Sequence, residues 1–190
     1  ALRSYRLPRW EGQQNYVELW VEKQALAGVL WPLAAEFHVT LMVNKGYSSQ
    51  SAMYDSAQRF LGNGDRQPVL LYLGDHDPSG EDMVRDIRDR LVMFGVEKID
   101  VRKVALTMEQ IEEHNPPPNP AKMSDSRAAA YVAKHGEHSW ELDALPPDVL
   151  SALIRDAFGE LHDADTMAEV GEREDADKER LRETVKGLVS

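Results

Sequence analysis

Three acidic side chains stand where a parallel sheet would bring them together. Glu22 directly follows residues 16–21, which alternate and are rich in β-formers, while Asp75 and Asp77 follow the apolar run 68–73. The carboxyl ends of neighbouring parallel strands meet at one edge of a sheet. Aspartates at i and i+2 of an extended chain point to the same side, and such close like charges resist joint ionisation unless a cation lies between them. The pattern therefore predicts a site for a hard divalent cation.

Mg²⁺ or Mn²⁺ is the cation that these ligands favour. The three acids offer only oxygen atoms, and the chain contains no cysteine, so oxygen-preferring ions fit best. Such an ion can activate water or stabilise a leaving oxygen in phosphoryl transfer. A structural interpretation is also open, because Asp77 is followed by Pro-Ser-Gly, a sequence typical of a turn and a helix start.

Strands and helices alternate along the part of the chain that would position the acids. Strands are predicted at residues 16–21, 38–43, 68–73 and 99–105, and helices at residues 23–36, 48–61 and 79–94. This order predicts an α/β fold, with a Rossmann-like parallel sheet flanked by helices on both faces. A capping box at residues 107–110 and a proline-rich connector at 115–120 follow, and further helices are predicted at 124–134, 146–161 and 166–189.

The predicted organisation is one compact domain with appendages. We expect a lead-in segment at residues 1–15, an α/β domain at 16–145 and a helical C-terminal extension at 146–190. The chain begins at Ala1 without a methionine, and one interpretation is a truncated N-terminus with a domain missing upstream. The charged final helix has two open interpretations, a solvated helix or a docking element for a partner protein.

Three motifs together resemble the Toprim domain, most closely that of topoisomerase VI A subunits and their meiotic double-strand-break relatives. In this sequence they are Val21-Glu-Lys-Gln-Ala-Leu26, Asn44-Lys-Gly-Tyr-Ser48 and Gly74-Asp-His-Asp-Pro-Ser-Gly80. In that family a glutamate ends the first strand, a Lys-Gly-Tyr turn follows the second, and an Asp-x-Asp-Pro-x-Gly motif follows the third. The resemblance covers residues 16–105 and implies a Toprim-like fold.

The resemblance also implies roles for individual residues. Asp75 and Asp77 would hold the metal, Glu22 would be a further ligand or a general acid/base, and Lys23 and Gly46 would approach phosphate. A glycine before a helix N-terminus independently favours an anion facing backbone N–H groups, although an ordinary turn glycine is an equal alternative for Gly46.

Four residues beyond the resembling region are further candidates. Lys122 and Arg127 are candidates for phosphate contacts, with a helix start near Ser124 as the alternative interpretation. Glu141 and Asp143 are candidates for additional acids at the cation site, with a short strand edge as the alternative.

The sequence predicts no metal-binding role for His76, His135 or His138. His76, between the two aspartates, is expected to face solvent, with proton shuttling as a less favoured alternative. His135 and His138 have a spacing close to that of zinc ligands, but a glycine lies between them and no third strong ligand is near in sequence. A zinc site is therefore not predicted there.

The predicted function is an Mg²⁺-dependent enzyme that makes or breaks phosphodiester bonds in DNA, as a nuclease or a topoisomerase VI A-like strand-breaking module. A primase-like nucleotidyl transferase and a non-catalytic module that binds nucleic acid or a partner are the alternatives. In the family, a separate winged-helix domain supplies the tyrosine that breaks DNA. No such domain is visible here, so a partner protein or a missing upstream domain would have to supply that tyrosine.

Composition limits the partners. The net charge of -11 argues against a broadly basic grip on nucleic acid, so binding would depend on local patches and bound cations. No apolar run approaches the roughly 20 residues that span a bilayer, so no membrane partner is expected. The absence of cysteine fits a reducing compartment, and we expect a cytoplasmic protein.

Overall fold

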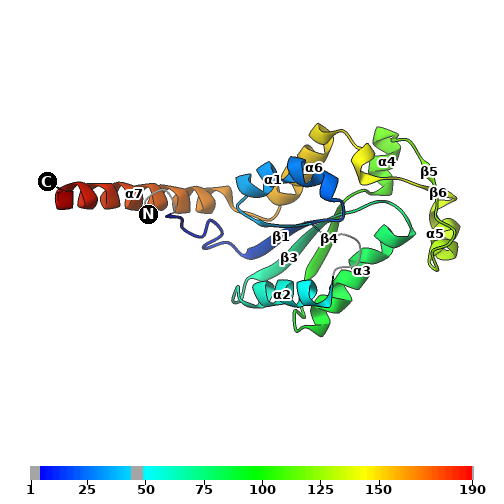
Figure 1. Ribbon diagram of the computed structural model, residues 1–190, viewed down its shortest axis with the longest axis horizontal. Coiled ribbons are helices and arrows are strands. Elements are labelled where there is room, and N and C mark those ends of the chain that lie inside the picture. The colour runs from blue at the N-terminus through cyan, green and yellow to red at the C-terminus, as the bar shows by residue number, and fades with distance from the viewer. Residues whose placement is uncertain (1–4, 44–48, 190) are drawn as a thin grey trace.

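A four-stranded parallel sheet forms the centre of the molecule. The computed structural model describes residues 5–43 and 49–189. Its strands are β1 (Asn15–Val21), β2 (Thr40–Val43), β3 (Gln67–Leu73) and β4 (Asp100–Ala105), in the spatial order β2-β1-β3-β4. Helices cover both faces (Figure 1). The predicted α/β class, with a parallel sheet flanked by helices, is confirmed.

The two central strands are buried on both faces. β1 and β3 pair in parallel over their full length, and the pairing ends with Val21 beside Leu73. The apolar run in β3 explains its central position, because a strand covered by helices on both sides exposes no polar face. This register makes β1 and β3 end at the same level of the sheet.

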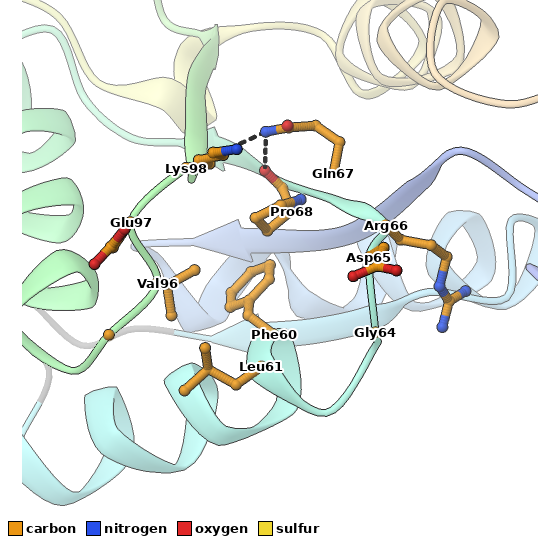
Figure 2. Close-up of a pocket in the computed structure, with 11 residues that line it drawn as sticks. Phe60, Leu61, Gly64, Asp65, Arg66, Gln67, Pro68, Val96, Glu97 and Lys98 are labelled. Atoms are coloured by element: carbon orange, nitrogen blue, oxygen red, sulfur yellow. Dashed lines mark hydrogen bonds between the residues drawn. The ribbon is translucent and has the colours of Figure 1, made fainter.

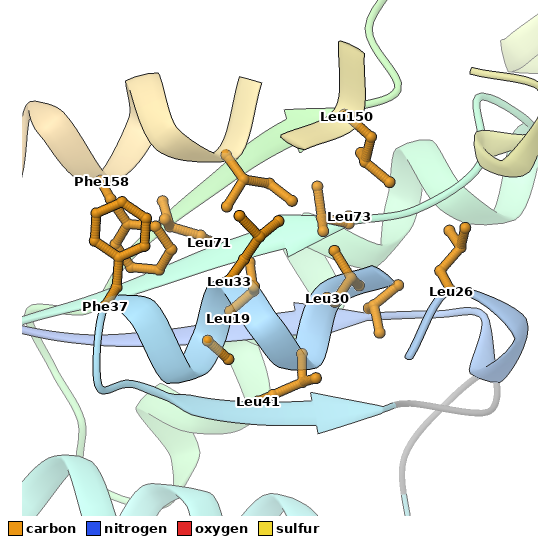
Figure 3. Packing of buried hydrophobic residues seen from close by; sticks show 14 of the residues in the cluster. Leu19, Leu26, Leu30, Leu33, Phe37, Leu41, Leu71, Leu73, Leu150 and Phe158 are labelled. Carbon is orange, nitrogen blue, oxygen red and sulfur yellow. The ribbon is translucent and has the colours of Figure 1, made fainter. Parts of the chain in front are cut away.

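Different helices cover the two faces of the sheet. Helices α1 (Ala27–Glu36) and α6 (Pro147–Gly159) pack on the face that carries Leu19 and Leu71, and Figure 3 shows Phe37 stacked on Phe158 there. Helices α2 (Gln50–Leu61) and α3 (Pro78–Met93) pack on the face that carries Trp20 and Tyr72. Helix α6, near the end of the chain, is therefore part of the main core.

Helix starts follow local capping chemistry. The Ser49 hydroxyl accepts a hydrogen bond from the Ala52 N–H at the start of α2. Thr107 and Gln110 form the predicted capping box of α4 (Met108–His114). Lys23 is extended, and the first helical turn after β1 is the 3₁₀ helix η2 (Gln24–Leu26).

Two of the element boundaries that differ from those predicted have a local cause. β2 begins two residues later than expected, because His38 adopts a positive φ of 52° that ends the preceding helical turn. Helix α5 (Ala128–His135) begins at Ala128 instead of residue 124, because the Asp125 carboxylate binds the Arg127 N–H and guanidinium before the helix starts.

The segment after α4 folds over the carboxyl edge of the sheet. It contains a short antiparallel pair, β5 (Asn119–Pro120) and β6 (His138–Ser139), followed by the 3₁₀ helix η3 (Leu142–Ala144). An isolated antiparallel bridge between His76 and Trp140 attaches it to the loop that follows β3. The residues of this segment are thereby brought next to the predicted acidic site.

Helix α7 (Ala164–Val189) extends away from the sheet, and the N-terminal segment runs beside its first half (Figure 1). Glu174 is buried there, accepts the Leu7 N–H at 2.9 Å and pairs with Arg9 at 3.2 Å. Farther along, Leu181 is 41% exposed. Within residues 5–43 and 49–189, no helix combines the length and apolar character needed to cross a bilayer.

Candidate functional site

The three predicted acids lie at the topological switch point of the sheet. β1 and β3 are spatial neighbours, and the chain proceeds outward from them in opposite directions, to β2 on one side and β4 on the other. Ligands of open α/β sheets bind at this crevice. The pairing continues one residue past β1, since the Glu22 N–H donates to the Leu73 carbonyl at 3.0 Å. Glu22 is therefore fixed beside the loop that carries Asp75 and Asp77.

Close backbone packing shapes that loop. A Cβ atom on Gly80 would lie 2.1 Å from the Asp75 carbonyl oxygen, so only glycine lets α3 begin this close to the strand end. The Gly80 N–H donates to Oδ1 of Asp77 at 2.6 Å, which makes Asp77 the N-cap of α3. Oδ1 of Asp77 therefore has the structural role of a helix cap, and Oδ2 is not part of that cap.

Burial and mutual repulsion act on the carboxyl groups. Burial raises the pKa of Glu22, a 3.0 Å hydrogen bond from the Tyr72 hydroxyl opposes this, and the charges of Asp75 and Asp77 raise it further. Burial also raises the pKa of Asp75, opposed by the Leu142 N–H, which donates to Oδ1 at 2.8 Å, and by Lys23. The protein holds negative charge here at an energetic cost.

Lys23 partly neutralises that charge. Its Nζ lies 2.9 Å from Glu141, 2.9 Å from Asp143 and 3.4 Å from Asp75. Burial lowers the pKa of Lys23, but hydrogen bonds to Asp143 and Glu141 outweigh it, so the net shift is upward. The two additional acids proposed from the sequence are therefore brought to the site, where they contact Lys23.

The donor set fits a hydrated magnesium ion. In the described part of the chain, Oδ2 of Asp75 and Oδ2 of Asp77 have no hydrogen-bond donor. Glu22, Asp75 and Asp77 do not form a closed cage. Among the described residues, they are not a group of three whose ligand atoms all lie within 4.8 Å of one another. Mg²⁺ keeps several waters and is usually held by one or two carboxylates, so an open pair of aspartates with Glu22 nearby suits it.

Among the described residues, neither Arg127 nor Lys122 is seen in contact with the three acids. Arg127 is bound to Asp125 at 2.8 Å and to Asp82 on α3 at 3.2 Å, and Lys122 is exposed. Gly46 lies outside the described residues.

A cluster that the sequence did not predict lies on the other side of the same loop. His76 is 1% exposed, so the expectation that it faces solvent is wrong. Its Nε2 lies 3.7 Å from Oε1 of Glu81, and Nε2 of His135 lies 3.9 Å from Oε2 of the same glutamate. These three side chains are the group whose ligand atoms lie within 4.8 Å of one another. Burial lowers the pKa of His76, which keeps the ring neutral near pH 7 although Glu81 opposes the shift.

No local signal marks this cluster in the sequence. His76 and Glu81 do not share a helical or strand spacing, and His135 comes from a helix far along the chain. The alternation of an extended chain does give one hint, because the residue between two aspartates that share a side points to the opposite side.

A shallow pocket lies at the other end of the sheet. Figure 2 shows it between the end of α2 and the amino ends of β3 and β4, lined by Phe60, Asp65, Gln67 and Lys98 among others. The Gln67 amide donates to the Lys98 carbonyl at 2.5 Å there. Because this pocket precedes the strands, it is separate from the acids that follow them.

The fold and the site together define a Rossmann-like α/β protein with a cluster of acids at its switch point. We call this cluster the acidic edge; it consists of Glu22, Asp75, Asp77, Glu141 and Asp143. No family model matches the chain, and no curated protein sequence matches it significantly. The interpretation of the site therefore depends on its own residues.

Proposed function

We propose that this chain is a Toprim-type, Mg²⁺- or Mn²⁺-dependent enzyme that breaks or makes phosphodiester bonds in DNA. The observation that carries the proposal is the convergence of Glu22, Asp75 and Asp77 at the switch point, where burial and mutual repulsion favour a cation. The order of the three sequence motifs adds support.

Each residue has a distinct part in this proposal. Asp75 and Asp77 hold the cation through Oδ2 of each carboxylate, directly or through water. When bound, the ion stabilises negative charge that develops on phosphoryl oxygens. Glu22, whose pKa is raised by burial, accepts or donates the proton of the attacking or leaving oxygen. Lys23 orients a substrate phosphate at the same edge.

Hydrolysis by water is the version that the described residues support. Tyr72 and Tyr131 are buried with their hydroxyls in hydrogen bonds, and the Tyr5 hydroxyl donates to Asp177 on the distant helix α7. Tyr54 is exposed, but it lies on α2 in contact with Phe94. None of these four tyrosines presents a free hydroxyl beside the three acids, so the proposal uses water, in place of a tyrosine, as the attacking group.

Nicking of supercoiled plasmid tests the proposal. The wild-type protein should nick DNA with Mg²⁺ or Mn²⁺ and not with EDTA, and Asp75→Ala/Asp77→Ala should lose the activity. Asp65→Ala is the matched control, because Asp65 is an exposed acid at the amino end of β3. Equal nicking by the double variant would overturn the proposal, as would no nicking by a wild-type protein that binds the ion. Incorporation of labelled nucleotide on a single-stranded template would instead indicate primase-like transfer.

One observation favours a second candidate, a non-catalytic module that binds DNA or a partner. Lys23 already supplies a positive charge among Asp75, Glu141 and Asp143, so the edge has a counterion of its own. DNA binding that is unchanged in Glu22→Gln, without turnover under Mg²⁺ or Mn²⁺, would support this candidate over the enzyme.

A further inference from the structure

We propose that His76, Glu81 and His135 form a second metal site, selective for a nitrogen-preferring divalent transition-metal ion such as Zn²⁺. This inference does not rest on the proposed function. Two imidazoles and one carboxylate suit Zn²⁺ and its neighbours in the transition series, whereas Mg²⁺ prefers oxygen ligands alone. The site would therefore take a different ion from the one proposed for Asp75 and Asp77.

The ligand atoms are close to the separation that an ion requires. Zinc–ligand bonds of about 2.0–2.2 Å in tetrahedral geometry place neighbouring ligand atoms about 3.3–3.6 Å apart. Nε2 of His76 and Nε2 of His135 lie 3.7 Å and 3.9 Å from the nearer oxygens of Glu81. The two contacts end on different oxygens of Glu81, and one ligand atom from each of the three residues lies within 4.8 Å of the others. The three side chains would close around a bound ion, and three protein ligands leave a fourth position for water.

Tyr131 fixes the tautomer of His76. Its hydroxyl oxygen lies 2.8 Å from Nδ1 of His76, 3.0 Å from the His76 carbonyl and 2.9 Å from the His138 carbonyl. Both carbonyls can only accept, so the single hydroxyl proton goes to them, and Nδ1 must donate to the hydroxyl oxygen. Nε2 of His76 then carries a lone pair that points toward Glu81 and His135, as a metal ligand requires.

The surroundings hold this arrangement in place. Two backbone hydrogen bonds with Trp140, of 2.9 Å and 3.0 Å, fix His76. The His76 and His135 rings pack edge to face with their centroids 4.7 Å apart. Metal-binding histidines commonly donate their second ring nitrogen to a fixed partner, and Tyr131 is such a partner here. Glu81 is 31% exposed and gives an ion access from solvent.

Lys103 occupies the position of a competing cation. Its Nζ lies 2.5 Å from Oε1 of Glu81 and also donates to the Asp75 carbonyl at 3.0 Å. A bound ion would replace Lys103 as the partner of Glu81, and Lys103 would keep its hydrogen bond to the Asp75 carbonyl. The ion would then join the loop after β3, helix α3 and helix α5, and so fix the segment that carries Glu141 and Asp143.

Metal-free protein, prepared with a chelator and dialysed, tests the site by titration with Zn²⁺ in excess Mg²⁺. We expect one Zn²⁺ per chain and a rise in Tm. His135→Ala should weaken Zn²⁺ binding more than about 100-fold, since losing a ligand costs more than the 10–100-fold typical of an outer partner. His138→Ala is the matched control, because that exposed imidazole lies outside the cluster.

Further variants keep the test valid if His135→Ala fails to fold. Glu81→Gln keeps the side-chain size and should lose Zn²⁺ binding as well. Tyr131→Phe should weaken binding about 10–100-fold by freeing the tautomer. Lys103→Met should tighten binding, and Arg102→Met, on the same strand, should not. Equal Zn²⁺ binding by wild type, His135→Ala and Glu81→Gln would overturn the proposal, as would the absence of Zn²⁺ binding by wild type.

Discussion

The hydroxyl of Tyr72 on β3 donates a 3.0 Å hydrogen bond to Oε2 of Glu22 at the end of the neighbouring strand β1. Tyr72 is fully buried, and this burial together with the charges of the nearby acids raises its pKa, so the hydroxyl remains a donor. The contact connects the apolar core between the sheet and helices α2 and α3 to the acidic edge. It also partly offsets the cost of burying the Glu22 carboxyl.

Tyr72→Phe should therefore raise the pKa of Glu22 further and destabilise the protein. A hydrogen bond to a charged group contributes about 1.5–3 kcal/mol to the free energy of unfolding. Urea denaturation at neutral pH measures the loss, and carboxyl titration by NMR measures the pKa. Tyr54→Phe is the control, with an expected change within about 0.5 kcal/mol because Tyr54 is exposed. A Glu22 pKa that does not rise would contradict the expected effect of the hydrogen bond.

Glu22→Gln should change how stability depends on pH. Because the folded-state pKa of Glu22 is raised by burial, the folded protein binds this proton more tightly than the unfolded chain. The resulting stabilisation is complete below the unfolded pKa, about 4.3, and is lost as the pH rises through the folded value. Metal-free wild type should lose more stability than Glu22→Gln between about pH 4 and 7. Parallel profiles in urea denaturation would show that the burial of Glu22 has no such effect.

Lys23→Ala should increase the affinity of the acidic edge for Mn²⁺. Removing the cation leaves Asp75, Glu141 and Asp143 without their shared partner, so their negative charge attracts a divalent ion more strongly. The same change should weaken DNA binding if Lys23 contacts phosphate. Calorimetric Mn²⁺ titration and a DNA-binding assay at constant salt separate the two effects. Unchanged Mn²⁺ affinity would mean that Lys23 is not the counterion of this edge.

The buried pair of Arg59 and Glu18 should contribute strongly to stability. Glu18 is fully buried and accepts from Arg59 at 2.8 Å and 2.9 Å, while Arg59 is 36% exposed. Arg59→Ala leaves a buried carboxylate without its cation, which costs about 3 kcal/mol, the lower end for broken buried pairs. Arg85 is exposed and pairs with acids on its own helix, so Arg85→Ala should change the free energy of unfolding much less than Arg59→Ala. Similar losses in urea denaturation would contradict the assigned burial effect.

The sheet and the acidic edge follow from local sequence patterns. The apolar run of β3 and the alternation of β1 predict two strands, and chain order alone makes them parallel. The placement of Asp75 after β3 and Glu22 after β1 follows from those boundaries. Their adjacency depends on the order of strands in the sheet, which the sequence left open and the pairing of β1 with β3 supplies.

Long-range contacts account for what the sequence did not predict. The burial of His76 depends on its backbone bridge to Trp140 and on its contact with Tyr131. Tyr131 lies 55 residues farther along the chain. A segment with three consecutive prolines gives no periodicity from which to predict that return to the sheet. For the same reason the spacing of His135 to His138 pointed to no zinc site, while the partners of His135 are nearby only in space.

Calorimetric titration with Mg²⁺ and Mn²⁺ tests most directly whether the acidic edge holds a cation. Chelator-treated wild type, Asp75→Ala/Asp77→Ala and the control Asp65→Ala should be compared at the same pH and salt. We expect wild type and the control to bind the ion alike, and the double variant to lose that binding. Identical binding by all three proteins, or none by wild type, would contradict the central claim.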